Sequence, residues 1–140
     1  MIRRLMSLCT VLLAVMVSAE QSQKIGDLEV HYAVVNTSFL QPDVASRYGV
    51  VTGKDRAIVN LSVLGPTDQS LEATVTGSTL NLIGQTSNLE FATIRERDSI
   101  YYIAPLRFTD RDTLRFRLVV TLADRPPMQV EFQQQMFVDP

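Results

Sequence analysis

Hydrophobic and polar residues alternate along most of this chain with a period of two. In the segment 114–122, leucine, phenylalanine and valine occupy every second position, and mostly polar residues stand between them. This pattern is typical of a strand that buries one face. The strands expected on this basis are 28–35, 57–64, 71–78, 88–94, 100–104, 114–122 and 129–138.

Clusters of turn-forming residues separate these segments. They lie at 65–68, 84–87, 109–112 and 124–127, and are rich in Gly, Pro, Asp, Ser and Thr. One segment departs from the strand pattern and predicts a short helix near 42–48. There, Pro42 suits a first helical turn, Asp43 suits the positive end of the helix dipole, and Gly49 suits the position after the last turn.

Short strands at regular spacing, with no long helix, indicate an all-β protein. We expect an immunoglobulin-like β-sandwich of about seven strands with one short helix. A barrel is the alternative, because the chain has no Trp and its single Cys cannot form the disulfide of antibody domains. In the last strand, Gln134 falls on the apolar face, so we expect either a bulge or a hydrogen-bonded buried glutamine there.

The N-terminus has the three-part layout of a secretory signal. Arg3 and Arg4 precede an apolar run over 5–17, and small residues end at Ala19. As a helix, the run would reach about 20 Å, short of the roughly 30 Å of a bilayer core. We therefore expect cleavage after Ala19 and no stable membrane anchor afterwards. Cys9 lies inside the apolar run, which argues against a lipoprotein signal.

The expected organisation is a cleavable signal peptide over 1–19, a flexible N-terminus over 20–27 and a single β-sandwich domain over 28–140. Beyond position 19 the chain has no cysteine and therefore no disulfide. It carries 11 basic against 15 acidic residues, a net charge of −4, which argues against nucleic-acid binding.

Catalytic chemistry has little support in this sequence. One histidine, His31, would have to serve as the only imidazole base, and no Gly-x-Ser-x-Gly segment exists. One histidine without cysteines does not make a zinc site. We therefore expect no cofactor and no enzyme activity, although a pair of carboxylates like that of a glycosidase stays open because acidic residues are common.

Polar and aromatic residues at strand ends and beside the short helix are the candidates for binding. They are His31, Asn36, Phe39, Tyr48, Gln85 and Tyr101. His31 would make a pH-sensitive contact if it lay on a binding face. Arg115 and Arg117 would either form ion pairs on a solvated sheet face or bind an anionic ligand.

Several short motifs together resemble a known family. They are His31-Tyr32, the segment 36–40 with Pro42, Ala45 and Tyr48, and the segments 60–63, 81–85, 89–91, 100–104 and 132–139. The set is similar to an uncharacterised family of small secreted proteins of Gram-negative gammaproteobacteria, a domain of unknown function. The resemblance covers about 28–139. It implies a periplasmic immunoglobulin-like domain and assigns no activity and no site residue.

The function we expect is that of a periplasmic, non-catalytic module that binds or assists another protein of the cell envelope. Strand addition at a sheet edge is one mode open to such a fold. The alternatives are a small-ligand or lipid-binding sandwich and, with less support, a hydrolase.

Overall fold

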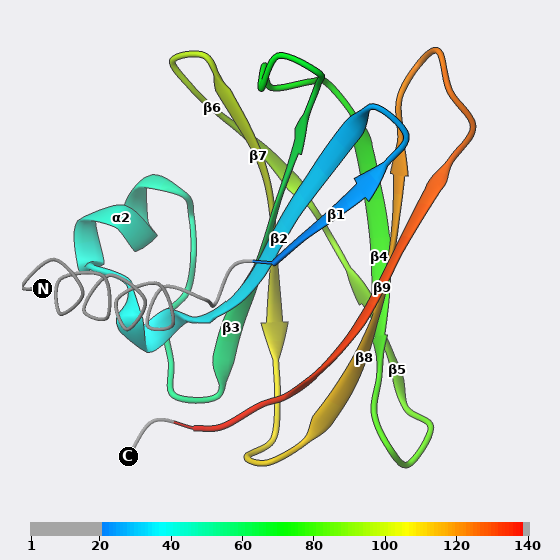
Figure 1. The fold of residues 1–140 in the computed structure, drawn as a ribbon. Helices are drawn as coiled ribbons and strands as arrows, with labels where there is room; N and C mark the ends of the chain where they lie inside the picture. Colours follow the sequence, from blue (N-terminus) through cyan, green and yellow to red (C-terminus); the bar gives the residue numbers. More distant parts are fainter. Residues whose placement is uncertain (1–20, 139–140) are drawn as a thin grey trace, which may run out of the picture.

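The computed structural model describes residues 21–138. The predicted signal peptide and its cleavage site therefore lie outside the described residues. Two antiparallel sheets face each other, and a short helix lies beside one of them (Figure 1). The strands are β1 (Gln21–Ile25), β2 (Leu28–Asn36), β3 (Arg56–Leu64), β4 (Thr74–Leu80), β5 (Thr86–Leu89), β6 (Ala92–Glu96), β7 (Ser99–Arg107), β8 (Thr113–Thr121) and β9 (Met128–Gln135).

The first sheet, sheet A, has the strand order β1-β2-β3-β7-β6, and the second, sheet B, has the order β5-β4-β8-β9. The predicted β-sandwich is confirmed, with nine strands in place of about seven. Strands β2, β4, β7 and β9 all run toward the lower end of the sandwich in Figure 1. Because of this common direction, the segments that follow these strands all begin at one end of the molecule.

The core lies between the two sheets, as alternation requires. Sheet A contributes residues such as Val30, Val59 and Leu61, and sheet B contributes Leu118 and Val130, all of them fully buried. Aromatic rings bridge the layers. Phe132 stacks on Tyr32 at a centroid distance of 4.5 Å and on Phe116 at 4.6 Å. Side chains therefore fill the space between the sheets.

Tyr102 is a buried polar residue within this core. Its side chain is 1% exposed, and its hydroxyl oxygen accepts a bond from Ala73 N at 2.7 Å and donates to Leu71 O at 3.1 Å. Burial raises the pKa of this phenol above its usual value. The hydroxyl thus fixes the irregular segment between β3 and β4 onto sheet A.

The predicted helix is present as α2 (Pro42–Arg47), preceded by a 3₁₀ turn, η1 (Thr37–Phe39). Pro42 begins the helix, and Gly49 follows it with a positive φ of 68°, which glycine adopts without strain. Ala45 of α2 is buried, as are Ile58 and Ile103, whose neighbours in β3 and β7 point into the core. These three apolar residues lie outside the inter-sheet core cluster.

The structure corrects four details of the predicted elements. Residues 21–25, expected to be a flexible N-terminus, form β1 and pair with β2. The expected strand 88–94 is two strands, β5 in sheet B and β6 in sheet A, because the chain crosses between the sheets at 90–91. Strand β4 begins at Thr74, later than expected. The β8–β9 register is continuous up to Gln135, so Gln134 occupies a regular, half-buried position without a bulge.

Candidate functional site

The six predicted binding residues do not form one cluster. His31 and Tyr101 share a small hollow on the outer face of sheet A, while Asn36 and Phe39 share a groove beside the ends of β2 and β9. Gln85 lines a polar pocket at the lower end of the sandwich, and Tyr48 lies apart from all three. The structure therefore brings four of the six residues together as two pairs.

The hollow of His31 and Tyr101 is small, with a volume of about 30 Å³. Glu29 Oε1 lies 2.5 Å from His31 Nε2, and the Oδ1 atom of Asn60 is buried without a hydrogen-bond partner among the described residues. A space of this size accommodates on the order of one water molecule. The arrangement fits a structural polar cluster better than a ligand site.

Tyr48 has a structural position at the end of α2. Its hydroxyl bonds the carboxylate of Glu96 in β6. The contact joins the helix to the edge strand of sheet A, so the side chain that we expected to bind a partner is occupied within the protein.

A groove runs between the end of β2 and the end of β9, with a volume of about 320 Å³. We call it the edge groove. Its walls are Val34, Val35, Asn36, Phe39, Gln134, Gln135, Met136 and Phe137. None of these residues is charged. Asn36 Nδ2 donates to the carbonyl oxygen of Phe137 at 2.8 Å, which ties one wall to the other.

Thr37, which the sequence did not single out as a site residue, sets the position of Phe39. It is 1% exposed, and its hydroxyl lies 3.0 Å from Arg56 O, 3.1 Å from Gly53 O and 3.0 Å from Gly53 N. These contacts fix η1 against the segment before β3. Phe39, two residues later, has a side chain that is 69% exposed at the edge groove.

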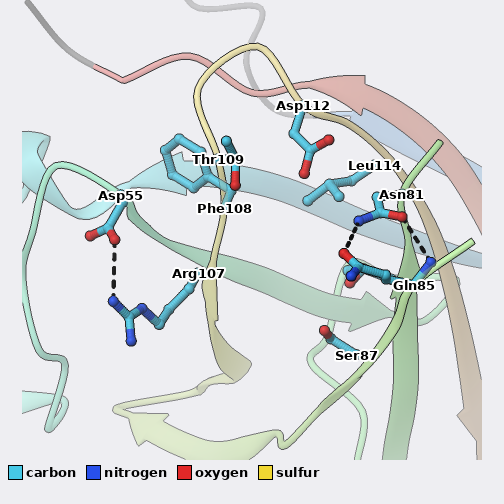
Figure 2. A pocket seen from close by; sticks show the side chains of 10 residues that line it. Asp55, Asn81, Gln85, Ser87, Arg107, Phe108, Thr109, Asp112 and Leu114 are labelled. Atoms are coloured by element: carbon cyan, nitrogen blue, oxygen red, sulfur yellow. Dashed lines mark hydrogen bonds and ion pairs between the residues drawn. The ribbon is translucent and has the colours of Figure 1, made fainter. Parts of the chain in front are cut away.

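Gln85 belongs to a polar pocket of about 300 Å³ at the lower end of the sandwich, shown in Figure 2. On one side of the pocket, Arg107 Nη2 lies 3.3 Å from Asp55 Oδ2. On the other side, Asn81 Nδ2 donates to Gln85 Oε1 at 2.8 Å. Asp112 lines the pocket between them. The charge of Arg107 is thus already balanced by Asp55.

The β4–β5 turn is built around Asn81. Its side-chain oxygen accepts from Gln85 N at 2.8 Å and from Ile83 N at 3.2 Å, and its backbone N–H bonds Gln85 O at 3.0 Å. The side chains of Leu82 and Ile83 are each 79% exposed at the tip. An organised turn therefore presents two adjacent apolar side chains to solvent.

Large exposed hydrophobic residues of the described chain occur in the segments that follow β2, β4 and β9. Five are found: Phe39, Val51, Leu82, Ile83 and Phe137. We call the segments 37–55, 81–85, 108–112 and 136–138, which follow β2, β4, β7 and β9, the loop end; within it, α2 lies along the side of sheet A (Figure 1). None lies in the turns at the opposite end, among the residues that the structure describes.

Sequence reasoning missed four of these five residues and named only Phe39. The available signal was the adjacent pair Leu82-Ile83 inside a turn, since turn residues are mostly polar. Phe137 falls on the face of the expected strand 129–138 opposite to that of Gln134, and strand alternation does not predict an exposed hydrophobic residue there. The position of the five in segments of the loop end depends on strand direction, which a single sequence does not state.

Two ion pairs lie toward the end opposite the loop end. There, Arg125 Nη1 lies 2.5 Å from Asp27 Oδ1, and this hydrogen bond holds the pKa of Asp27 below its usual value. Arg95 pairs with Glu72 and lowers the pKa of that carboxyl in the same way. On the outer face of sheet B, Arg117 Nε lies 3.6 Å from Glu131 Oε1. The two ends of the sandwich thus differ in chemistry.

No group of three or more His, Cys, Asp or Glu residues that could hold a metal ion occurs within 21–138. No helix in this part of the chain is long and apolar enough to cross a membrane.

Solved structures similar to this chain include a crystal structure of a DUF4426 family protein from Pseudomonas aeruginosa PAO1. It is 38% identical, with a TM-score of 0.80 over 89% of this chain and 99% of that one. Two structures of FetP from uropathogenic Escherichia coli strain F11 are also similar. One is a copper-bound variant (TM-score 0.63, 10% identity, 86% and 96% covered), and one is the as-isolated protein expressed recombinantly in the periplasm (0.60, 10%, 87% and 96%).

No match is found among the curated proteins. The likeness to FetP shows a shared fold at 10% identity. Residues 22–139 match the family described as "Domain of unknown function (DUF4426)", which includes nearly all of the described chain. This chain belongs to the DUF4426 family.

Proposed function

We propose that this protein is a non-catalytic, periplasmic module that binds another protein of the cell envelope through its loop end. The observation that carries the proposal is the position of the five exposed large hydrophobic residues, all of which lie in segments of that end. Two pairs of them lie together: Leu82 with Ile83 in the β4–β5 turn, and Phe39 with Phe137 in the edge groove. Exposed apolar surface on a soluble domain is typical of an interaction site. Export through a cleavable signal, expected from the sequence, would place the domain in the periplasm.

The construction of the β4–β5 turn supports this proposal. Leu82 and Ile83 are held by the hydrogen bonds of Asn81, so little conformational entropy is lost when they are buried by a partner. Desolvating two such side chains contributes about 1.5–3 kcal/mol each by area. A binding surface needs apolar side chains of this kind as anchors, whereas a turn that only faces solvent does not need them.

A small ligand has less support. Core side chains fill the space between the sheets, and the polar pocket of Figure 2 already balances Arg107 with Asp55. The copper named in the FetP structure does not extend to this chain, because the likeness is one of fold and the described residues lack a group of metal ligands. Copper binding is therefore not part of the proposal.

The experiment that tests the proposal is cross-linking of the tagged, exported full-length protein in cells. We expect a discrete cross-linked partner with the wild type, and its loss in the double variant Leu82→Asp/Ile83→Asp. The control is Pro66→Asp, an exposed turn position at the opposite end. If the double variant is folded and exported but traps the same partner as the wild type, the loop end is not the binding surface.

A further inference from the structure

Strand β2 is covered by β1 over only part of its length. The pairing of β1 with β2 ends at Gln21 opposite Tyr32, while β3 continues along the other side of β2 as far as Asn36. Within 21–138, no strand pairs with Ala33–Asn36 on the β1 side. Figure 1 shows this lower part of β2 continuing past the start of β1.

The register identifies the backbone groups at this open edge. The β1–β2 hairpin has a two-residue loop between Ile25 and Leu28, with Gly26 at a φ of 62°. In such a hairpin the flanking residues form a hydrogen-bonded pair, and every second residue after Leu28 points its N–H and C=O toward β1. By this alternation, the backbone groups of Val34 and Asn36 face the open edge.

The open edge lacks the features that protect edges in other proteins. Charged side chains, prolines and bulges commonly block the addition of another strand. Residues 33–36 are Ala-Val-Val-Asn, and the register with β3 is continuous through them. The four positions therefore form an uncharged strand edge without a bulge.

The edge groove lies directly beside these positions. Val34, Val35 and Asn36 form one wall, and Gln134, Met136 and Phe137 belong to the wall opposite. A charged side chain entering this uncharged groove would lose hydration without gaining a charged partner. Apolar side chains would be desolvated favourably, and the groove volume of about 320 Å³ leaves room for them.

We infer that the open edge of β2 at Ala33–Asn36 binds an extended, uncharged and mostly apolar peptide segment of a partner protein, as an added antiparallel strand in line with β1. The backbone of an extended peptide can hydrogen-bond to the unpaired N–H and C=O groups of the strand. Alternate side chains of the peptide would then enter the adjoining edge groove. The inference rests on the proposed function and names the chemistry of the partner and its mode of binding.

The first test supplies such a strand within the same chain. Extending the β1 register places positions 19 and 17 opposite Val34 and Asn36. We would purify a chain beginning with Thr-Val-Thr-Val in place of residues 16–19, followed by residues 20–140, so that valine stands at positions 17 and 19, on the face of β1 that packs toward the core. The matched control has proline at positions 17 and 19, because proline donates no hydrogen bond.

Amide hydrogen exchange is the measurement. We expect exchange at Val34 and Asn36 to slow at least tenfold in the Thr-Val-Thr-Val chain relative to the proline control, with no change at the amides of β8. Equal exchange in the two chains would show that the edge does not accept a strand and would overturn the inference.

The second test distinguishes failure of this inference from failure of the proposed function. A photo-activatable phenylalanine is placed at Phe39, in the edge groove, or at Leu82, at the β4–β5 tip, in the exported full-length protein. We expect both positions to trap the same partner, and Val35→Lys, but not Pro66→Lys, to abolish trapping at Phe39. Because Pro66 is exposed in the turn after β3, at the opposite end, and lines neither the edge groove nor the loop end, its variant is the control.

Each outcome has a defined meaning. A partner trapped from Leu82 alone keeps the proposed function and overturns strand addition. No partner from either position overturns both. A second copy of this chain trapped at Phe39, together with a dimeric mass in light scattering, would also overturn the inference, because the occupant would be β2 or β9 of another copy.

Discussion

At the scale of single residues, the two hydrogen bonds of the Tyr102 hydroxyl are contacts that the alternating pattern does not predict. Tyr102 alternates with its neighbours in the strand expected over 100–104, and the structure places it in the core with Ala104. The pattern does not show that its hydroxyl serves two backbone groups, Ala73 N and Leu71 O, because these lie in an irregular segment about thirty residues away. Non-local hydrogen bonds of this kind depend on the complete fold.

Tyr102→Phe should lower the free energy of unfolding by about 1–3 kcal/mol, because it leaves the N–H of Ala73 and the carbonyl of Leu71 without this partner. Burial raises the pKa of Tyr102 in the folded state, so its contribution is complete below the unfolded pKa of 10.0 and is lost as the pH rises through the folded value. Urea unfolding at pH 7–11 measures both. If the wild type and the variant lose stability equally between pH 9 and 11, the assignment to Tyr102 is wrong.

Gly77 allows β4 and β8 to approach closely. A Cβ atom there would lie 2.6 Å from Leu118 Cδ2 and 2.9 Å from the carbonyl oxygen of Arg117. We expect Gly77→Ala to destabilise the protein by about 1–3 kcal/mol through overpacking. Thr76→Ala, at the exposed neighbouring position, is the control and should cost less. Thermal unfolding of the two variants measures the loss of stability. If Gly77→Ala is as stable as the wild type, β8 moves to make room for the Cβ atom and the close approach does not require glycine.

At the scale of elements, the sequence predicts strands well where one face is buried and poorly elsewhere. Strands β2, β3 and β8 match their predicted segments because strict alternation marks a half-buried strand. Strand β1 is mostly polar and was therefore expected to be flexible. The break between β5 and β6 was missed because residues 88–94 alternate across a point where the chain changes sheet.

Asn81 organises the β4–β5 turn, so its removal tests whether the turn is held rigidly. Asn81→Ala should cost about 0.5–1.5 kcal/mol for each side-chain bond lost to the amides of Ile83 and Gln85, and should speed exchange at those amides. Gln85→Ala removes only the side-chain contact and is the comparison variant. Exchange at Ile83 that is equal in wild type and Asn81→Ala would contradict this description of the turn.

The ion pair of Asp27 and Arg125 joins the β1–β2 turn to the β8–β9 turn. Because the pKa of Asp27 is lowered in the folded state, its contribution to stability is present above the unfolded pKa of 3.8 and is lost as the pH falls through the folded value. Arg125→Gln should therefore reduce the loss of stability between pH 5 and pH 2. Chemical unfolding across this range measures it, and identical pH profiles would refute the coupling.

At the scale of the whole molecule, the two ends of the sandwich are chemically different. The family and the sandwich were predictable, because alternation and a combination of short motifs are local properties of a sequence. The grouping of the binding residues was not predicted. Asn36 and Phe39 are close in sequence, whereas Phe137 reaches them through the direction of β9. A surface made from several loops depends on strand order and direction, which the pattern of one sequence does not specify.

The measurement that tests the central claim most directly is site-specific photo-cross-linking in cells at the two ends of the sandwich. The cross-linking side chain is placed at Ile83 in the loop end or at Asp68 in the turn at the opposite end, both of them exposed positions. We expect one discrete envelope protein to be trapped from Ile83 and none from Asp68. The same partner trapped equally from both positions, or none from either in a folded and exported protein, would contradict a binding surface at the loop end.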